Sequence, residues 1–285
     1  MNYNIIGDIP GHADELEALL LKVGYEKQDD TYAHPEKRKV IFVGDLVDRG
    51  PKIRETLHLV KAMCDAGNAQ AVMGNHEFNA ICFHTPDAKN RGFYRKHGLK
   101  EIEQHLKTLR QFKGHEKEFQ EFLKWFKQLP LFLEFENFRV VHACWDNKHI
   151  DWIRRNYKGI NTEFLALAND KNNPGFVYEV IDETLKGKEY RLPEGLSFTD
   201  KDGQARHKCR IKWWAKLGEV SVYKDVLMAC PPEIADAPIP DPASLYFYSD
   251  SKPVFFGHYW LTGTPFIENE KAVCLDWLWR KGEFW

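Results

Sequence analysis

Short apolar runs alternate with amphipathic stretches through the first third of the chain. The runs Tyr3–Gly7, Lys39–Val43 and Ala69–Met73 have the length and composition of buried strands. Between them, Ala13–Val23 and Ile53–Ala66 carry apolar residues at the spacing of one helix face. Such alternation of strands and helices predicts an α/β layer.

Two later segments interrupt this pattern. The first, at about residues 86–128, is charged and helical from about Asn90 to Gln128, and we expect its aromatic stripe at 119–126 to be core. The second, at about residues 146–250, is rich in Gly and Pro and predicts a long loop-rich insertion. We interpret both as cap insertions in a single domain that covers residues 1–285.

Strand character returns around these insertions. Phe132–Glu136 and Arg139–His142 are predicted to form a hairpin with its turn at residues 136–137. Val254–Phe256 and Ala272–Leu275 are further apolar runs of strand length. We expect them to belong to a second sheet.

Composition narrows the class of protein. The 285 residues carry a formal net charge of -2, which gives no reason to expect a nucleic-acid or membrane-surface partner. The N-terminal residues resemble no signal peptide, and no run is long and apolar enough to cross a bilayer. The six cysteines are scattered without a C-x-x-C pair and are expected to be reduced thiols. These features predict a cytoplasmic protein.

Polar residues stand where the predicted strands end. Asp8, Asp45 and Asn75 follow the first three strands, and His142 and His258 follow later ones. In open α/β sheets the ligand site lies beyond the carboxyl ends of the strands. Carboxylate, amide and imidazole together suit Mn, Fe or Zn, and a pair of such metals can clamp a phosphoryl group. Asp45 is the candidate for a bridging carboxylate.

Neighbouring residues supply further chemistry. His76 follows a probable ligand and can face a substrate as a general acid. Asp48 could orient its imidazole, and Arg49 could hold two phosphate oxygens.

These pieces resemble a known family. Gly7-Asp8, GDLVDRG from Gly44, GNHE from Gly74, Val141-His142-Ala143 and Gly257-His258 occur in the order found in calcineurin-like metallophosphoesterases of the PPP-type branch. The resemblance is dense over residues 4–79 and then rests on single motifs. Within the branch it is most similar to bacterial members, among them serine/threonine phosphatases, symmetrical dinucleoside tetraphosphatases and polynucleotide kinase-phosphatases.

The resemblance implies a double β-sheet sandwich flanked by helices, with two divalent metals at the sheet ends, Mn foremost. Metal 1 would be bound by Asp8 and Asp45. Metal 2 would be bound by Asp45, Asn75, His142 and His258. His76 would be the general acid, with Asp48 as its partner and Arg49 as a phosphate contact.

One position departs from the family pattern. Pro10 stands where the family has a histidine ligand to metal 1, and proline offers no side-chain donor. Trp260 stands where some relatives have a second histidine after His258. We therefore expect metal 1 to be weak or absent. His12 could serve as a substitute ligand, but we expect it to be an ordinary residue of the first helical turn.

A basic cluster offers candidates for substrate binding. Arg206 and Arg210 lie with Lys208 and Lys212 beside Trp213-Trp214. The cluster could clamp a phosphate and stack a nucleotide on the indoles. It could equally be a solvated basic face over a buried tryptophan pair.

The sequence therefore predicts a hydrolase of phosphoric esters with a substrate that is a phosphorylated small molecule, a nucleotide or a phosphoprotein. The alternative, supported by Pro10, is a catalytically impaired relative that binds a phosphorylated ligand without turning it over.

Overall fold

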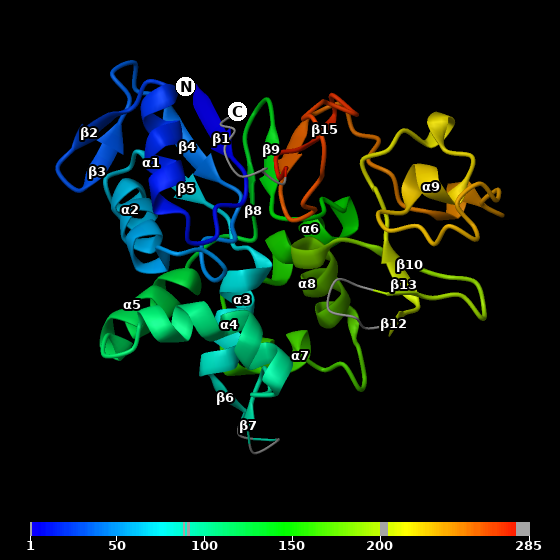
Figure 1. Ribbon diagram of the computed structural model, residues 1–285, viewed down its shortest axis with the longest axis horizontal. Coiled ribbons are helices and arrows are strands. Elements are labelled where there is room, and N and C mark those ends of the chain that lie inside the picture. Colours follow the sequence, from blue (N-terminus) through cyan, green and yellow to red (C-terminus); the bar gives the residue numbers. More distant parts are fainter. Residues whose placement is uncertain (1, 88, 90–91, 200–204, 278–285) are drawn as a thin grey trace.

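A computed structural model describes residues 2–87, 89, 92–199 and 205–277 of the chain (Figure 1). Its first sheet is parallel and has the order β1-β4-β5. The strands are β1 (Tyr3–Ile6), β4 (Lys39–Phe42) and β5 (Ala69–Ala71), and the helices between them are α1 (Ala13–Lys22) and α2 (Ile53–Asp65). The predicted strands and helices of this layer are confirmed.

The second sheet has the order β15-β14-β9-β8. Its strands are β8 (Phe132–Glu134), β9 (Arg139–Val141), β14 (Val254–Phe256) and β15 (Ala272–Cys274). β8 and β9 form the predicted antiparallel hairpin, closed by a hydrogen bond from Phe135 N to Phe138 O at 2.9 Å. β14 lies parallel to both β9 and β15.

Alternating side chains of β4 place the two sheets face to face. Val40 and Phe42 are buried in the large core that includes the helices. Ile41 and Val43 point the other way and form a separate buried cluster with Val140 of the second sheet. Since successive side chains of a strand point to opposite faces, one strand contributes to both cores. The fold is the expected α/β sandwich of two sheets flanked by helices.

The first helix of the first insertion begins later in the chain than expected. It contains the short hairpin β6 (Pro86–Asp87) and β7 (Gly92–Phe93), followed by α4 (Leu99–Gln111) and α5 (Glu116–Phe126). The prediction of a helical pattern from Asn90 was wrong, because the first helix begins at Leu99 after Gly98. The aromatic stripe of α5 is buried as predicted. α4 and α5 pack beside α2 and α3 (Asn75–His84).

The second insertion is more regular than its Gly and Pro content suggested. Its first part is helical: α6 (Asn147–Asn156), α7 (Thr162–Ala168) and α8 (Phe176–Lys186). Short elements follow: the hairpins β10 (Glu189–Arg191) with β13 (Lys208–Arg210) and β11 (Phe198–Thr199) with β12 (Ala205–Arg206), then η1 (Leu217–Glu219), α9 (Tyr223–Val226) and η2 (Pro242–Ser244). The description as loop-rich holds for the part after α8 only. Helix α6 begins at the side-chain cap of Asp146.

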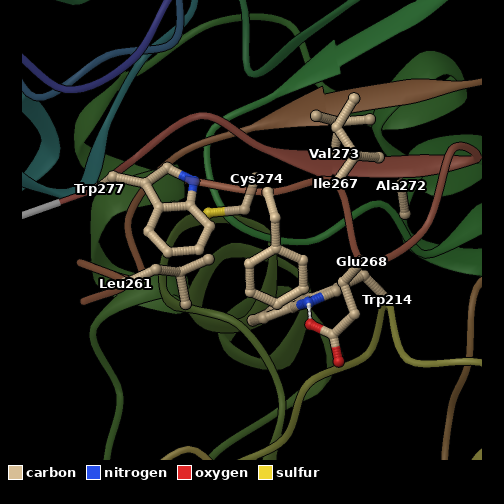
Figure 2. A pocket seen from close by; sticks show the side chains of 9 residues that line it. Trp214, Leu261, Ile267, Glu268, Ala272, Val273, Cys274 and Trp277 are labelled. Atoms are coloured by element: carbon tan, nitrogen blue, oxygen red, sulfur yellow. Dashed lines mark hydrogen bonds between the residues drawn. The ribbon is translucent and has the colours of Figure 1, made fainter. Parts of the chain in front are cut away.

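The tryptophan pair of this insertion belongs to the core. Trp213 and Trp214 are 0% and 1% exposed and pack against Phe256 of β14. The Trp213 indole donates to Ala143 O at 2.9 Å, and the Trp214 indole donates to Glu268 Oε2 at 2.8 Å (Figure 2). Because both rings are buried, they cannot stack on a nucleotide, so the indole part of the clamp hypothesis was wrong.

Two further expectations concern the whole chain. Each of the six cysteines is a free thiol within the described residues. Among those residues, none of the helices has both the length and the apolar character needed to cross a bilayer.

Candidate metal centre and active site

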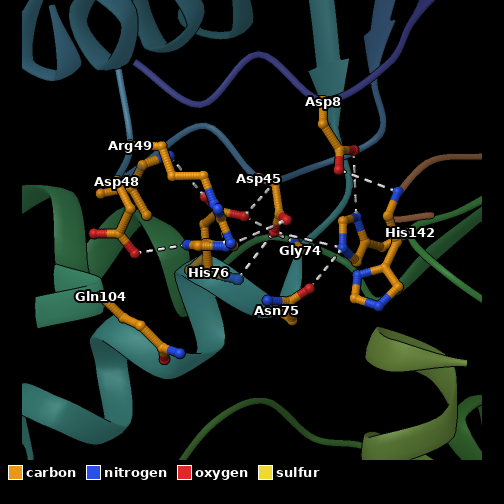
Figure 3. Close-up of polar contacts among 12 residues, drawn as sticks. Asp8, Asp45, Asp48, Arg49, Gly74, Asn75, His76, Gln104 and His142 are labelled. Carbon is orange, nitrogen blue, oxygen red and sulfur yellow. Dashed lines mark hydrogen bonds and ion pairs between the residues drawn. The ribbon is translucent and has the colours of Figure 1, made fainter. Parts of the chain in front are cut away.

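The ends of strands from both sheets meet at one place (Figure 3). Asp8 follows β1, Asp45 follows β4, and Asn75 begins α3 just after β5. From the second sheet, His142 follows β9 and His258 follows β14. One ligand atom each of Asp45, His142 and His258 lies within 4.8 Å of the others. The structure thus brings together residues that the sequence separates by more than 200 positions.

The loops that carry these residues adopt an unusual backbone. Asp45, Asp48, Arg49 and His258 have positive φ angles of 52°, 76°, 56° and 75°. For residues with a side chain this left-handed region costs of order 1–3 kcal/mol each. Gly74 has to be glycine, because a Cβ there would lie 2.3 Å from the Asp45 nitrogen. The surrounding contacts must hold these loops against the strain.

Glu77 supplies part of that restraint. Its fully buried carboxylate accepts hydrogen bonds from the backbone nitrogens of Asp45 and Gly74 at 2.9 Å and of Leu46 at 2.8 Å. It therefore ties the loop after β4 to the start of α3. Sequence reasoning quoted the GNHE motif but missed this role. The signal was a glutamate three residues after the helix N-cap.

The acceptors around His142 leave room for a cation. Its Nδ1 lies 2.8 Å from Val43 O, which can only accept, so Nδ1 carries the proton. The lone pair of Nε2 then faces Asn75 Oδ1 at 3.2 Å and Asp45 Oδ1 at 3.4 Å. In addition, His258 Nε2 is buried without a hydrogen-bond partner. A divalent metal satisfies such converging acceptors, so the residues predicted for metal 2 fit the ion.

The protonation of the two histidines agrees with this fit. Burial lowers the pKa of His142 and lowers that of His258 well below its ordinary value. The positive charge of Arg210 lowers both further. Neutral imidazoles are the form that binds a metal.

His76 is held as a general acid would be. Its Nδ1 lies 2.7 Å from Asp48 Oδ2, and its Nε2 accepts a hydrogen bond from Arg49 Nε at 3.5 Å. Although burial lowers the pKa of His76, the negative charges of Asp45 and Asp48 raise it above its ordinary value. The Arg49 guanidinium stacks 3.9 Å above the Trp260 ring, which positions it beside the imidazole. The three residues predicted for catalysis therefore lie together.

Asp48 is anchored by the first insertion, which sequence reasoning missed. Its Oδ1 accepts a hydrogen bond from His105 Nδ1 at 2.7 Å and one from Thr108 Oγ1 at 2.5 Å, both on α4. His105 in turn contacts His84 Nε2 at 3.1 Å. Although burial raises the pKa of Asp48, the hydrogen bonds from His105 and His76 lower it below its ordinary value. No motif marks His105 or Thr108, because only the packing of α4 brings them to the site.

The metal 1 side is less complete. Asp8 Oδ2 accepts from His258 N at 3.1 Å, while its Oδ1 is buried without a hydrogen-bond partner. Pro10 lies in the turn between β1 and α1 and offers no ligand atom. The His12 imidazole is 42% exposed and lies 3.4 Å from Glu15 Oε1, on its own helix. Its exclusion as a ligand stays a prediction.

The two candidate arginines differ in position. Arg210 ends β13, close enough to His142 and His258 for its charge to affect both. Arg206 lies in the separate β11–β12 hairpin. Of the two arginines, Arg210 is the one whose charge lowers the pKa of histidines in the centre.

Comparisons with known proteins match the chain to one family. The profile of the calcineurin-like phosphoesterase family matches residues 1–258. An asymmetrical bis(5'-nucleosyl)-tetraphosphatase, PrpE of Oceanobacillus iheyensis, is 32% identical over 143 residues, which are 50% of this chain and 55% of that protein. A symmetrical bis(5'-nucleosyl)-tetraphosphatase of Vibrio campbellii is 34% identical over 223 residues, which are 73% of this chain and 72% of that protein.

A solved metallophosphoesterase of Sphaerobacter thermophilus aligns with 50% of this chain and 46% of its own at 25% identity and a TM-score of 0.33. The chain spans about half the length of the Oceanobacillus relative. The family profile, in contrast, runs through all five strand-end motifs, from Asp8 to His258. The chain belongs to the calcineurin-like phosphoesterase family.

Proposed function

We propose that the chain is a divalent-metal-dependent hydrolase of phosphoric esters or anhydrides. One observation carries the proposal: an imidazole held by a buried carboxylate, His76 on Asp48, lies beside the acceptor cluster of Asp45, His142 and His258. A protein that only binds phosphate does not need an oriented proton donor next to its metal ligands.

Each residue has a role in this proposal. Asp45, Asn75, His142 and His258 would hold one metal, and Asp8 and Asp45 would hold the other. When bound, the metals supply positive charge that stabilises the phosphoryl group during an in-line displacement. Once a substrate phosphate binds the Arg49 guanidinium, Nε2 of His76 would be free to carry the proton that it donates to the leaving oxygen, while Asp48 keeps Nδ1 occupied. Arg49 binds phosphate oxygens, with its guanidinium plane set by Trp260.

A nucleotide polyphosphate is the substrate class that we propose. The named relatives from Oceanobacillus and Vibrio are dinucleoside tetraphosphatases. Arg49 lies beside His76, and Arg210 is near enough for its charge to affect His142 and His258, so the two arginines would suit a ligand with several phosphates. Manganese is the proposed metal, and a cytoplasmic location stays a prediction from the sequence.

The test is hydrolysis by metal-stripped protein resupplied with Mn²⁺. We expect turnover of p-nitrophenyl phosphate and faster turnover of diadenosine tetraphosphate. His76→Ala should lower both roughly 100-fold or more, while His115→Ala, a change at a partly exposed histidine, should leave them intact. Mn²⁺ binding with no turnover of either compound would instead support the alternative of an impaired relative that only binds phosphate.

A further inference from the structure

One face of α4 runs along the loop that carries Asp48. Gln111, at the end of the helix, donates to Gly50 O at 3.2 Å. One turn earlier, Thr108 donates to Asp48 Oδ1 at 2.5 Å. Side chains three and four residues apart lie on the same face of a helix, so Gln104 is the next one along this face. Gln104 therefore lies beyond Asp48, on the side away from Gly50.

Gln104 holds a guanidinium near the proposed proton donor. Figure 3 shows the Gln104 side chain extending from α4 near Asp48 and His76. Its Oε1 accepts a hydrogen bond from Arg95 Nη2 at 2.5 Å. Burial lowers the pKa of Arg95, and the negative charge of Asp48 acts against that shift. The Arg95 guanidinium and the Asp48 carboxylate are thus near enough for their charges to interact.

Arg95 is fixed in place but has no carboxylate partner. Its backbone nitrogen donates to Cys82 O at 3.0 Å, which ties it to α3, the helix that starts at Asn75. The residue is half-buried, and Gln104 offers it a neutral amide rather than a negative charge. Among the residues that the structure describes, Arg95 forms an ion pair with none of the carboxylates. A guanidinium withdrawn from water without a counter-charge favours an anionic ligand such as a phosphate group.

A second cation reaches the same place from the second insertion. Asn169 Nδ2 donates to Cys82 Sγ at 3.3 Å, and Lys171 N donates to Asn169 O at 2.9 Å. Burial raises the pKa of the Cys82 thiol to about 12, and the nearby positive charges of Arg95 and Lys171 oppose this shift. Both cations therefore lie around Cys82, one contributed by each insertion.

We propose that Arg95 and Lys171 bind a phosphate group in the leaving part of the substrate. This inference rests on the proposed function, in which His76 gives its proton to the leaving oxygen. In a nucleotide polyphosphate that oxygen belongs to a further phosphate group, which then lies beyond His76. A guanidinium held there by Gln104 can bind two oxygens of this phosphate. The phenol that leaves p-nitrophenyl phosphate carries no such group, so the two insertions would select polyphosphates over simple esters.

The test compares two substrates in the Mn²⁺-loaded chain. Arg95→Gln should lower kcat/KM for diadenosine tetraphosphate roughly 10- to 100-fold, the range for loss of a hydrogen bond to a charged group, and leave that for p-nitrophenyl phosphate nearly unchanged. Lys171→Gln should give a smaller loss of the same kind, and Arg95→Lys should restore part of the activity. Arg110→Gln, the same change at an exposed arginine of α4, is the matched control. Circular dichroism and thermal unfolding check that each variant folds.

A binding measurement tests the same site without turnover. Inorganic tripolyphosphate, titrated into the metal-stripped chain by calorimetry, should bind about tenfold more weakly to Arg95→Gln than to the unchanged chain or to Arg110→Gln. Equal losses for the two substrates would assign Arg95 to general support of the fold and overturn the inference, as would unchanged tripolyphosphate affinity. Turnover of p-nitrophenyl phosphate by the unchanged chain would leave the proposed function standing in either case. No turnover of either substrate would defeat the proposed function, and tripolyphosphate binding would then decide the inference alone.

Discussion

The two halves of the candidate metal centre lie at the ends of the same two sheets. They differ in the number and type of candidate ligands. The half formed by Asn75, His142 and His258 has an amide and two neutral imidazoles around Asp45. The half around Asp8 has Pro10 where the family pattern has a histidine, so its predicted ligands are the carboxylates of Asp8 and Asp45. Buried carboxylates repel one another without a cation, whereas neutral imidazoles do not.

This difference shows how one part of a paired site can change while the other is kept. The proposed proton donor His76 is hydrogen-bonded to Asp48 and Arg49, and its Nε2 lies 3.8 Å from Oδ2 of Asp45. Pro10 takes part in neither hydrogen bond of His76, although its turn packs against the loop of Asp48 and Gly50. We therefore expect Pro10 to affect the strength of one metal site more than the arrangement of His76 and Asp48.

The largest expected effect is the loss of kcat when His76, beside the complete half, is replaced. His76→Ala should lower kcat roughly 100- to 10,000-fold, the usual contribution of general acid catalysis. Because His76 is not a metal ligand, Mn²⁺ affinity should stay unchanged in the calorimetric titration. Asn75→Ala should instead lower both Mn²⁺ affinity and kcat. Equal loss of metal in the two variants would contradict the separate roles.

The next largest effect is a difference in Mn²⁺ affinity between the two metal sites. Mn²⁺ titration of the metal-free chain should show two affinities that differ by roughly 10- to 100-fold, the range associated with a lost supporting partner. The Tm should rise in two steps as Mn²⁺ is added, because each bound ion stabilises the folded state. A single affinity for two ions would mean that Pro10 weakens nothing.

Pro10→His alone should tighten the weaker site by about tenfold, the lower end of that range. Initial rates at limiting Mn²⁺ should rise, whereas rates at saturating Mn²⁺ should change little. The control is Pro10→Ala, which also opens the turn but adds no donor. A similar gain in Pro10→Ala would assign the effect to the backbone.

A smaller effect is expected at the anchor of Asp48. Thr108→Val removes the hydroxyl that donates to Asp48 Oδ1 and keeps the shape of the side chain. The free energy of unfolding should fall by about 1–3 kcal/mol, since a buried acceptor loses one partner. His105 still binds the same oxygen, so kcat should fall by roughly tenfold or less. Denaturant unfolding and steady-state kinetics measure the two quantities.

The smallest effect concerns substrate binding. Arg210→Ala should raise the KM for diadenosine tetraphosphate several-fold more than that for p-nitrophenyl phosphate, because only the longer ligand reaches the second arginine. Arg155→Ala, at an exposed arginine of α6, is the matched control. An equal rise for both substrates would mean that Arg210 does not distinguish them.

Much of the centre could be predicted from local patterns. Asp8, Asp45, Asn75, His142 and His258 each follow an apolar run, so a strand end marks every one of them. The secondary structure of the insertions was harder to predict, because Gly and Pro occur in short connections between helices as well as in long loops. The segment at 147–186 folds into α6, α7 and α8 although its pattern is weak. Tertiary packing overrides such local preferences.

By itself the sequence determined the two-layer strand and helix pattern, the motifs at the strand ends and the absence of a donor at Pro10. Only the tertiary structure decided which distant residues support them. Thr108 reaches Asp48 because α4 packs there, and Leu275 lies against Gly7 because β15 ends beside β1. These contacts depend on how helices and strands pack against one another. Such tertiary contacts produce no periodic pattern of residues along the sequence.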